Sequence, residues 1–136
     1  MTKPTEGAPA ASVHSTCEVR YLVRTSARRH QVDADEPEGA GGGDAAATPL
    51  ELLATGLSAC TAITLRMYAE RKGWDLGAVE VDCRVLVEGT GYRFERVVKL
   101  GHPLDDAQRT RLAEIAEKTP VTRIVKAGAA VRTEVR

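Results

Sequence analysis

Residues 49–72 read PLELLATGLSACTAITLRMYAERK, the longest helix-like stretch of the chain. Thr48 can cap its start, Pro49 suits the first helical position, and Glu51 has the spacing of a capping box. Gly73 supplies the left-handed residue that commonly ends a helix. Apolar positions extend almost all round this segment, a pattern that predicts a buried central helix. One side is expected to carry Leu53, Leu57, Cys60, Thr64, Met67 and Tyr68.

Cys60 lies near the middle of this stretch, among small residues from Gly56 to Ala62. A thiol there can be a small core residue or the reactive atom of a redox site. Small neighbours would let a ligand or another chain approach, and the residues alone leave both readings open. Cys17 and Cys83 each fall on the apolar face of a predicted strand, where a core role is favoured.

Outward from the helix, period-two alternation predicts strands over 15–24, 79–88 and 92–100, with a shorter strand over 30–34. Gly89 to Gly91 predicts a tight hairpin between the second and third of these. An amphipathic helix is expected over 105–118, and Thr119-Pro120 should start a short helix to about Val125. Alternation at 131–135 predicts a final strand. The order predicts an α+β fold with a largely antiparallel sheet.

A length of 136 residues fits one domain, and we expect a disordered N-terminal tail over 1–14 followed by a single domain over 15–136. Aromatic residues make up only 4%, so the core must be aliphatic. A small domain of this kind often gains stability from a second subunit. Lys+Arg and Asp+Glu are both 19, a balance that argues against nucleic acid as a partner.

No apolar run approaches the roughly 18 residues that span a membrane, and the N-terminus lacks the apolar core of a signal peptide. We therefore expect a cytoplasmic protein with no membrane partner. Three cysteines without CxxC spacing predict neither a disulfide framework nor a metal site. The glycines at 41–43 lack the spacing and the Lys of a phosphate-binding loop, so no cofactor is predicted.

The segments 49–53 (PLELL), 58–62 (SACTA) and 64–74 (TLRMYAERKGW) together resemble the OsmC/Ohr family, the osmotically inducible and organic hydroperoxide resistance proteins. The resemblance covers roughly residues 17–135. It implies an intertwined homodimer in which a long Cys-bearing helix lies against curved antiparallel sheets and the active sites lie at the dimer interface. It also implies thiol peroxidase chemistry, in which a peroxidatic cysteine becomes a sulfenic acid and condenses with a resolving cysteine.

Four positions of the family pattern decide whether this chain can carry out the same chemistry. Cys60 matches the peroxidatic cysteine, but Thr119 stands where the resolving cysteine is expected. The family's glutamate would fall at Leu50, whereas Glu51 is nine residues before Cys60, roughly 180° around a regular helix. Capping is therefore favoured over catalysis for Glu51, which stays a candidate catalytic residue. The activating arginine is not aligned, and the candidates are Arg20, Arg24, Arg28 and Arg29, with Arg66 and Arg71 expected to face solvent or a partner.

Two functions of different classes follow. The first is an OsmC-like redox protein that reduces organic hydroperoxides through a single reactive cysteine, Cys60, with an external thiol as reductant. The second is a non-catalytic OsmC-like dimer that binds a small molecule in its groove. A third hypothesis makes Cys83 or Cys17 a substitute resolving cysteine, which would need Cα atoms within about 7 Å.

Overall fold

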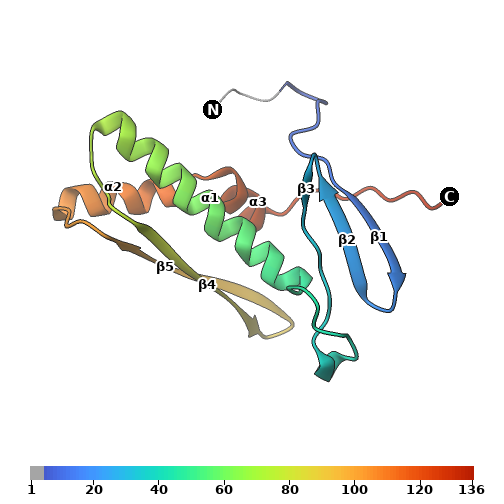
Figure 1. Cartoon of the computed structure of the whole chain (residues 1–136). Helices are drawn as coiled ribbons and strands as arrows, with labels where there is room; N and C mark the ends of the chain where they lie inside the picture. Colours follow the sequence, from blue (N-terminus) through green and yellow to red (C-terminus); the bar gives the residue numbers. More distant parts are fainter. Residues whose placement is uncertain (1–4) are drawn as a thin grey trace. The chain divides into compact units, whose positions relative to one another are not determined.

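The computed structural model describes residues 5–136 and divides into two compact units, one ending at Leu52 and the other spanning Leu53–Arg136. The long helix α1 (Pro49–Lys72) runs across the boundary (Figure 1). Antiparallel strands and this helix make a mixed α+β fold, which confirms the predicted class. The strands of the described residues form two antiparallel sheets, in keeping with the largely antiparallel pairing that the sequence predicts.

The first unit is a three-stranded antiparallel sheet in the order β1-β2-β3. The strands are β1 (His14–Val19), β2 (Leu22–Ala27) and β3 (His30–Gln31), followed by the 3-10 turn η1 (Glu38–Ala40). Residues 5–13 precede the sheet without helix or strand, and residues 1–4 of the predicted tail lie outside the described part. The loop after the sheet is tied together by buried Asp35, whose carboxylate accepts hydrogen bonds from the amides of Glu36 and Ala45.

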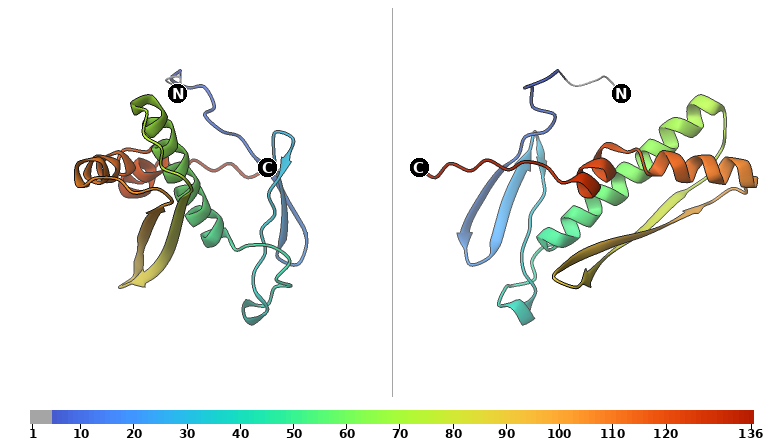
Figure 2. Two further views of the ribbon diagram at one scale, coloured as in Figure 1. Left: turned by 60° about the vertical axis from the view of Figure 1, so that its left-hand side comes forward. Right: turned by 180° about the vertical axis from the view of Figure 1, so that it is seen from behind.

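The second unit packs the greater part of α1 against a hairpin and two shorter helices (Figure 2). The hairpin pairs β4 (Val79–Glu88) with β5 (Gly91–Leu100) in continuous register from Val79 opposite Leu100 to Glu88 opposite Gly91. Its two-residue turn confirms the predicted tight connection. Helices α2 (Asp106–Ala116) and α3 (Pro120–Ala127) follow, with capping side chains from Asp105 and Thr119.

The core of this unit lies between α1, the hairpin and α2. It consists of six buried side chains: Leu65, Tyr68, Ala69, Leu76, Leu112 and Ala116. α1 contributes one face to it, and no other element of this unit covers the opposite apolar face. Leu53, Ile63 and Met67 on that open face are 47%, 52% and 43% exposed. Within this unit the prediction of a helix buried all round is therefore wrong, because the hairpin and α2 cover only one side of α1.

Two further expectations are corrected. Residues 129–136 form no strand, and Val131 and Val135 are 87% and 91% exposed. Alternation alone does not make a strand, because a strand needs a neighbour for its backbone hydrogen bonds, and no described strand pairs with this segment. Cys17 is exposed rather than part of a core.

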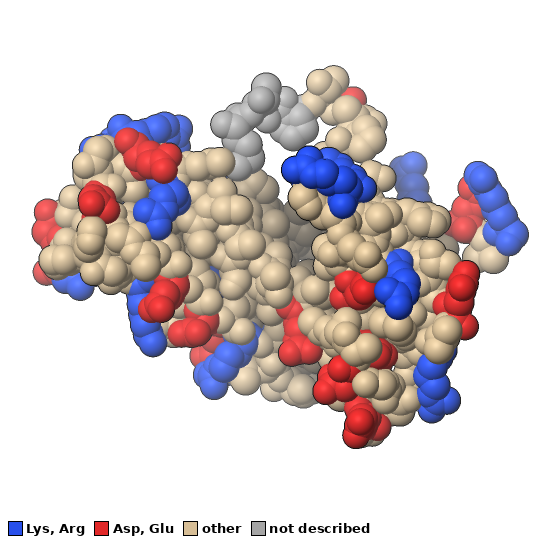
Figure 3. Space-filling view, in the orientation of Figure 1, with Lys and Arg blue, Asp and Glu red and all other residues tan. Residues whose placement is uncertain are grey.

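The surface and hydropathy bear on possible partners. Basic and acidic side chains are interspersed on the face shown in Figure 3, in keeping with equal numbers of each.

α1 is long and apolar enough to cross a membrane by length and composition, with a mean hydropathy of 1.2 over its best window. A helix that forms the core of a folded unit passes the same test, so this feature is weak evidence for a membrane span.

Candidate functional site

Cys60 is half-buried and lies on the open face of α1. Leu53, Gly56, Cys60, Ile63 and Met67 follow one another at intervals of three and four residues, so they share one side of the helix. We call these five residues the Cys60 stripe. The stripe places the Cys60 thiol in the middle of an apolar surface. None of its five residues is fully buried.

Thr64 lies one helical turn after Cys60. Residues four apart on a helix are surface neighbours, so its side chain projects beside the thiol. Its Oγ1 is buried and has no hydrogen-bond partner among residues 5–136. Buried hydroxyl groups are nearly always paired, so an unpaired one beside a thiol is notable. In the single chain this hydroxyl makes no hydrogen bond to the sulfur of Cys60.

Thr61 follows Cys60 in the chain but faces the interior, where it is fully buried. Its hydroxyl donates to the carbonyl of Leu57 at 2.7 Å and accepts a hydrogen bond of 2.9 Å from Nη1 of Arg96. This arginine stands on β5, and its side chain is only 13% exposed. The contact ties the turn of α1 that carries Cys60 to the hairpin.

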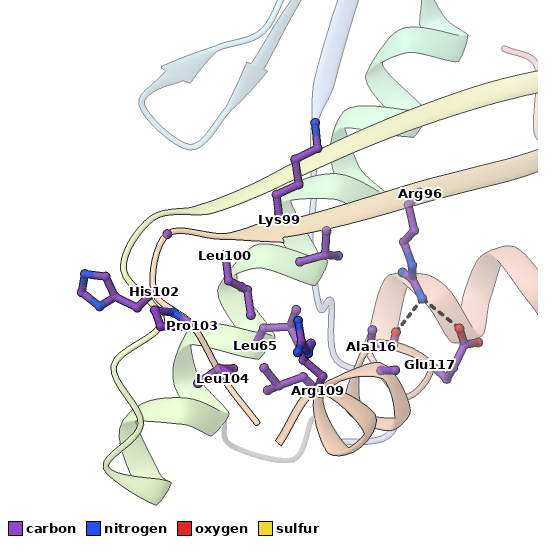
Figure 4. A pocket seen from close by; sticks show the side chains of 14 residues that line it. Leu65, Arg96, Lys99, Leu100, His102, Pro103, Leu104, Arg109, Ala116 and Glu117 are labelled. Carbon is purple, nitrogen blue, oxygen red and sulfur yellow. Dashed lines mark hydrogen bonds and ion pairs between the residues drawn. The ribbon is translucent and has the colours of Figure 1, made fainter. Parts of the chain in front are cut away.

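Arg96 also joins α2 to α3. Its guanidinium donates to Oγ1 of Thr122 and to the carbonyl of Ala116, both at 2.8 Å, and forms an ion pair of 3.4 Å with Glu117. The last two contacts are drawn in Figure 4. Sequence reasoning missed this residue. The sequence did carry one signal: Arg96 alternates along β5 with Phe94, Val98 and Leu100, so it shares their face of the strand.

Thr119 is fully buried and acts as the N-cap of α3, as predicted. Its Oγ1 accepts a hydrogen bond of 3.1 Å from the amide of Thr122 and lies 2.6 Å from the Thr122 hydroxyl. The threonine therefore keeps the structural role expected of this position. It belongs to the same polar network as Arg96, through Thr122.

Glu51 completes a capping box with Thr48 at the start of α1. Its carboxylate accepts a hydrogen bond of 2.9 Å from the amide of Thr48, and its own amide donates to the Thr48 hydroxyl at 3.1 Å. The backbone hydrogen bond from Thr48 is the main cause that lowers the pKa of Glu51. The capping role is thus present in the structure, and the catalytic role of Glu51 stays a prediction.

Two of the candidate arginines, Arg20 and Arg24, have partners within the first unit. Arg20 donates to the carbonyl of Gly41 at 2.8 Å, and Arg24 lies 3.6 Å from Asp33 in an ion pair. Arg28 adopts a positive φ of 55° in the turn after β2, next to Arg29. On α1, Arg66 donates to the carbonyl of Gly77, and Arg71 lies over the ring of Tyr68.

The other two cysteines are also free thiols. The thiol of Cys17 donates to the carbonyl of Arg20 at 3.2 Å. Cys83 is half-buried on β4 opposite Arg96, and burial raises its pKa, which keeps it protonated and weakly nucleophilic. Among residues 5–136, no group of three or more His, Cys, Asp or Glu side chains could hold a metal ion.

Two cavities open in the second unit. The larger, of about 790 Å³, lies between β5, α2 and Leu65 of α1. The smaller, of about 430 Å³, is lined by residues of α3, by the first half of β5 and by Leu57, three residues before Cys60. Arg96 and Glu117 line both cavities.

A long helix with a central cysteine, set against antiparallel strands, defines a class of α+β thiol-bearing domains, and comparison with known proteins identifies the family. The model of the OsmC-like proteins matches residues 41–134, so the chain belongs to the OsmC-like protein family. The matched region contains both Cys60 and Thr119. No protein with a curated description matches the chain.

Solved structures share the fold at low sequence identity. An OsmC-like protein from Mycoplasma pneumoniae superposes with a TM-score of 0.72 and 15% identity, covering 88% of this chain and 89% of its own. The organic hydroperoxide resistance protein OhrB of Bacillus subtilis gives 0.62 and 19%, with 88% and 92% covered. A Psychrobacter arcticus protein ascribed to osmotic stress and detoxification responses gives 0.76 and 17%, with 88% and 90% covered.

Proposed function

We propose that this protein is a homodimeric thiol peroxidase that reduces organic hydroperoxides through Cys60 alone. The observation that carries the proposal is the pairing of two positions within the OsmC-like match. The family resemblance assigns Cys60 on α1 to the peroxidatic position and residue 119 to the resolving position, where this chain has a buried capping threonine. Neither Cys17 nor Cys83 replaces the resolving thiol in this proposal.

The cycle has two balanced halves. The Cys60 thiolate attacks the outer oxygen of the hydroperoxide, the O–O bond breaks, and the alkoxide leaves as an alcohol after taking a proton. The sulfur is oxidised by two electrons to a sulfenic acid. A small external thiol then displaces water to give a mixed disulfide, and a second thiol releases reduced Cys60 and a disulfide of the two external thiols.

Thr64 supports this chemistry at the sulfur. Its hydroxyl, one turn after Cys60, is unpaired in the structure, and in this proposal a rotation of the side chain lets it donate a hydrogen bond to the thiolate. A hydrogen bond to the charged form favours that form and lowers the pKa of the thiol. Thr64 would then act as a positioning and activating residue, a role that the sequence alone did not suggest.

The Cys60 stripe supports the homodimer. An apolar helix face of this kind, open in the single chain, is a surface that a second copy can cover around its own two-fold axis. Residues three and four apart also match the seam spacing of paired helices. The site would then be completed at the subunit interface, in a protein of the reducing cytoplasm, where three free thiols persist and small thiols are available.

The test is to expose the reduced protein to cumene hydroperoxide and measure sulfenic acid at each cysteine by dimedone trapping and mass spectrometry. We expect rapid labelling at Cys60 in the wild-type protein and slower labelling in Thr64→Val, which keeps the shape of the side chain. Cys83→Ser serves as the matched control and should react like wild type. Equal labelling in Cys60→Ser, or none in the wild type, would rule the peroxidase out.

The alternative is a non-catalytic dimer that binds a small molecule in its groove. Exposed Leu50, where the family's glutamate is expected, favours it because the position offers an apolar surface and no carboxylate. Under this alternative the same experiment leaves Cys60 unlabelled while the protein remains a dimer.

A further inference from the structure

The larger cavity has an apolar floor with no cysteine in its lining. Leu65 of α1 and Leu112 of α2 are 1% and 4% exposed, and they belong to the core cluster. Val98, Leu100 and Leu104 extend the same surface. A volume of about 790 Å³ lies within the range of small-molecule sites, which are mostly apolar with a few polar groups that fix orientation.

The lining also carries more positive than negative groups. Its basic residues are Arg96, Lys99, His102 and Arg109, and its acidic residue is Glu117. Figure 4 shows that these side chains point in different directions. Lys99 and His102 point away from the leucines, and Arg96 turns toward Ala116 and Glu117, whereas Arg109 lies beside the apolar floor.

Arg109 is available to a ligand because its present partner holds it weakly. Its Nη2 lies 3.3 Å from Oδ1 of Asp106, in the first turn of α2. The two side chains are 65% and 100% exposed, and exposed ion pairs of this kind contribute little. A carboxylate that arrives with an apolar chain can replace Asp106 and form the two parallel hydrogen bonds that the guanidinium fork favours.

We propose that this cavity binds an aliphatic monocarboxylate, with the chain against the leucines and the carboxylate on Arg109. The site is separate from the proposed peroxidase chemistry, because Leu65 lies on the buried face of α1 and Cys60 on the open one. A single negative charge is favoured because Glu117 lines the cavity and Asp106 adjoins it.

The experiment is isothermal titration calorimetry of the full chain with decanoate, and with decan-1-ol as the neutral probe. We expect one decanoate per chain and weaker binding of the alcohol. Arg109→Gln should lower the decanoate affinity by at least ~10-fold, as expected for a charge-assisted hydrogen bond. Arg84→Gln, on an exposed strand position outside the lining, is the matched control and should bind like wild type.

A second pair of variants tests the cavity itself. Ala113→Phe places a ring in the cavity from an exposed position of α2 and should abolish binding, whereas Ala107→Phe, exposed on the same helix outside the lining, should not. Circular dichroism checks that each variant folds. Cys60→Ser should bind normally. The proposal is overturned if decanoate does not bind, if the alcohol binds equally well, or if the affinity falls in Cys60→Ser and not in Arg109→Gln.

Discussion

The guanidinium of Arg96 donates a 2.9 Å hydrogen bond to the hydroxyl of Thr61, 35 residues earlier in the chain. Thr61 faces the interior and Cys60 faces outward on the same turn of α1. The contact therefore holds in place the turn that carries Cys60. Because Arg96 also bonds α2 and Thr122 of α3, one side chain holds three helices in place beside the candidate site.

Replacing Arg96 by Met should therefore destabilise the fold strongly. The substitution keeps an apolar stem but leaves the buried carbonyl of Ala116 without this donor. We expect a loss of about 2–3 kcal/mol in the free energy of unfolding, the range for hydrogen bonds to a charged group. Urea unfolding measures it. Arg84→Met, whose exposed side chain pairs with Glu95, is the control and should change stability by no more than about 0.5 kcal/mol. Equal losses in the two variants would contradict the role given to Arg96.

Leu65 should be the residue of α1 whose packing matters most to the second unit. It is 1% exposed and contacts the core formed with Leu76 and Leu112. Truncation to Ala should cost about 2–5 kcal/mol, the transfer term plus the cavity left behind. Chemical denaturation followed by circular dichroism measures the change. A loss below about 1 kcal/mol would show that the helix relaxes onto the gap or is less buried in solution.

Ile63 tests the homodimer. It is 52% exposed in the single chain, on the Cys60 stripe. If a second copy covers the stripe, Ile63→Glu places a charge in an apolar interface and should convert the dimer to monomer. Size-exclusion chromatography with light scattering gives the mass. Lys118→Glu introduces the same charge at an exposed position between α2 and α3, and should leave the mass unchanged. A wild-type monomer, or a dimer in Ile63→Glu, would contradict the proposed interface.

Local patterns were enough to predict the class, the hairpin and the caps, because each depends on neighbours in sequence. Thr48 with Glu51, and Thr119 with Pro120, are examples that the structure confirms. The role of Arg96 was not predictable in this way, since its partners lie 20 to 35 residues away and are brought together by packing. Likewise, the segment with Val131 and Val135 has the alternating pattern of a strand. It has no neighbouring strand among the described residues to pair with, so both side chains stay exposed.

Glu51 gives a prediction for pH. Its pKa in the folded protein is lower than its ordinary value of 4.5, chiefly because the amide of Thr48 bonds the ionised carboxylate. A lowered pKa means that its stabilising effect is complete above the ordinary value and is lost as the pH falls through the folded value. Glu51→Gln keeps a capping side chain without the charge. The stability difference between wild type and Glu51→Gln should be present at pH 7 and vanish in acid, as measured by urea unfolding.

The same variant separates capping from catalysis. A residue that only caps α1 should leave the rate of Cys60 oxidation by cumene hydroperoxide unchanged at neutral pH when Gln replaces Glu. A large fall in that rate, with the helix content retained, would instead assign Glu51 to the catalytic machinery and reverse the preference for capping.

Thr119→Cys tests whether this position is the one that a resolving thiol would occupy. If Cys60 and residue 119 lie as the family resemblance implies, cumene hydroperoxide should first form the sulfenic acid and then an internal disulfide, which removes water. Mass spectrometry under non-reducing conditions identifies the linked peptides. Val121→Cys is the matched control on the same short helix, and Thr119→Ser keeps the cap. A disulfide requires Cα atoms within about 7 Å. If Cys60 stays a sulfenic acid while the new cysteine at position 119 remains unlinked, the two positions do not approach each other. This chain would then depart from the two-cysteine arrangement in geometry as well as in sequence.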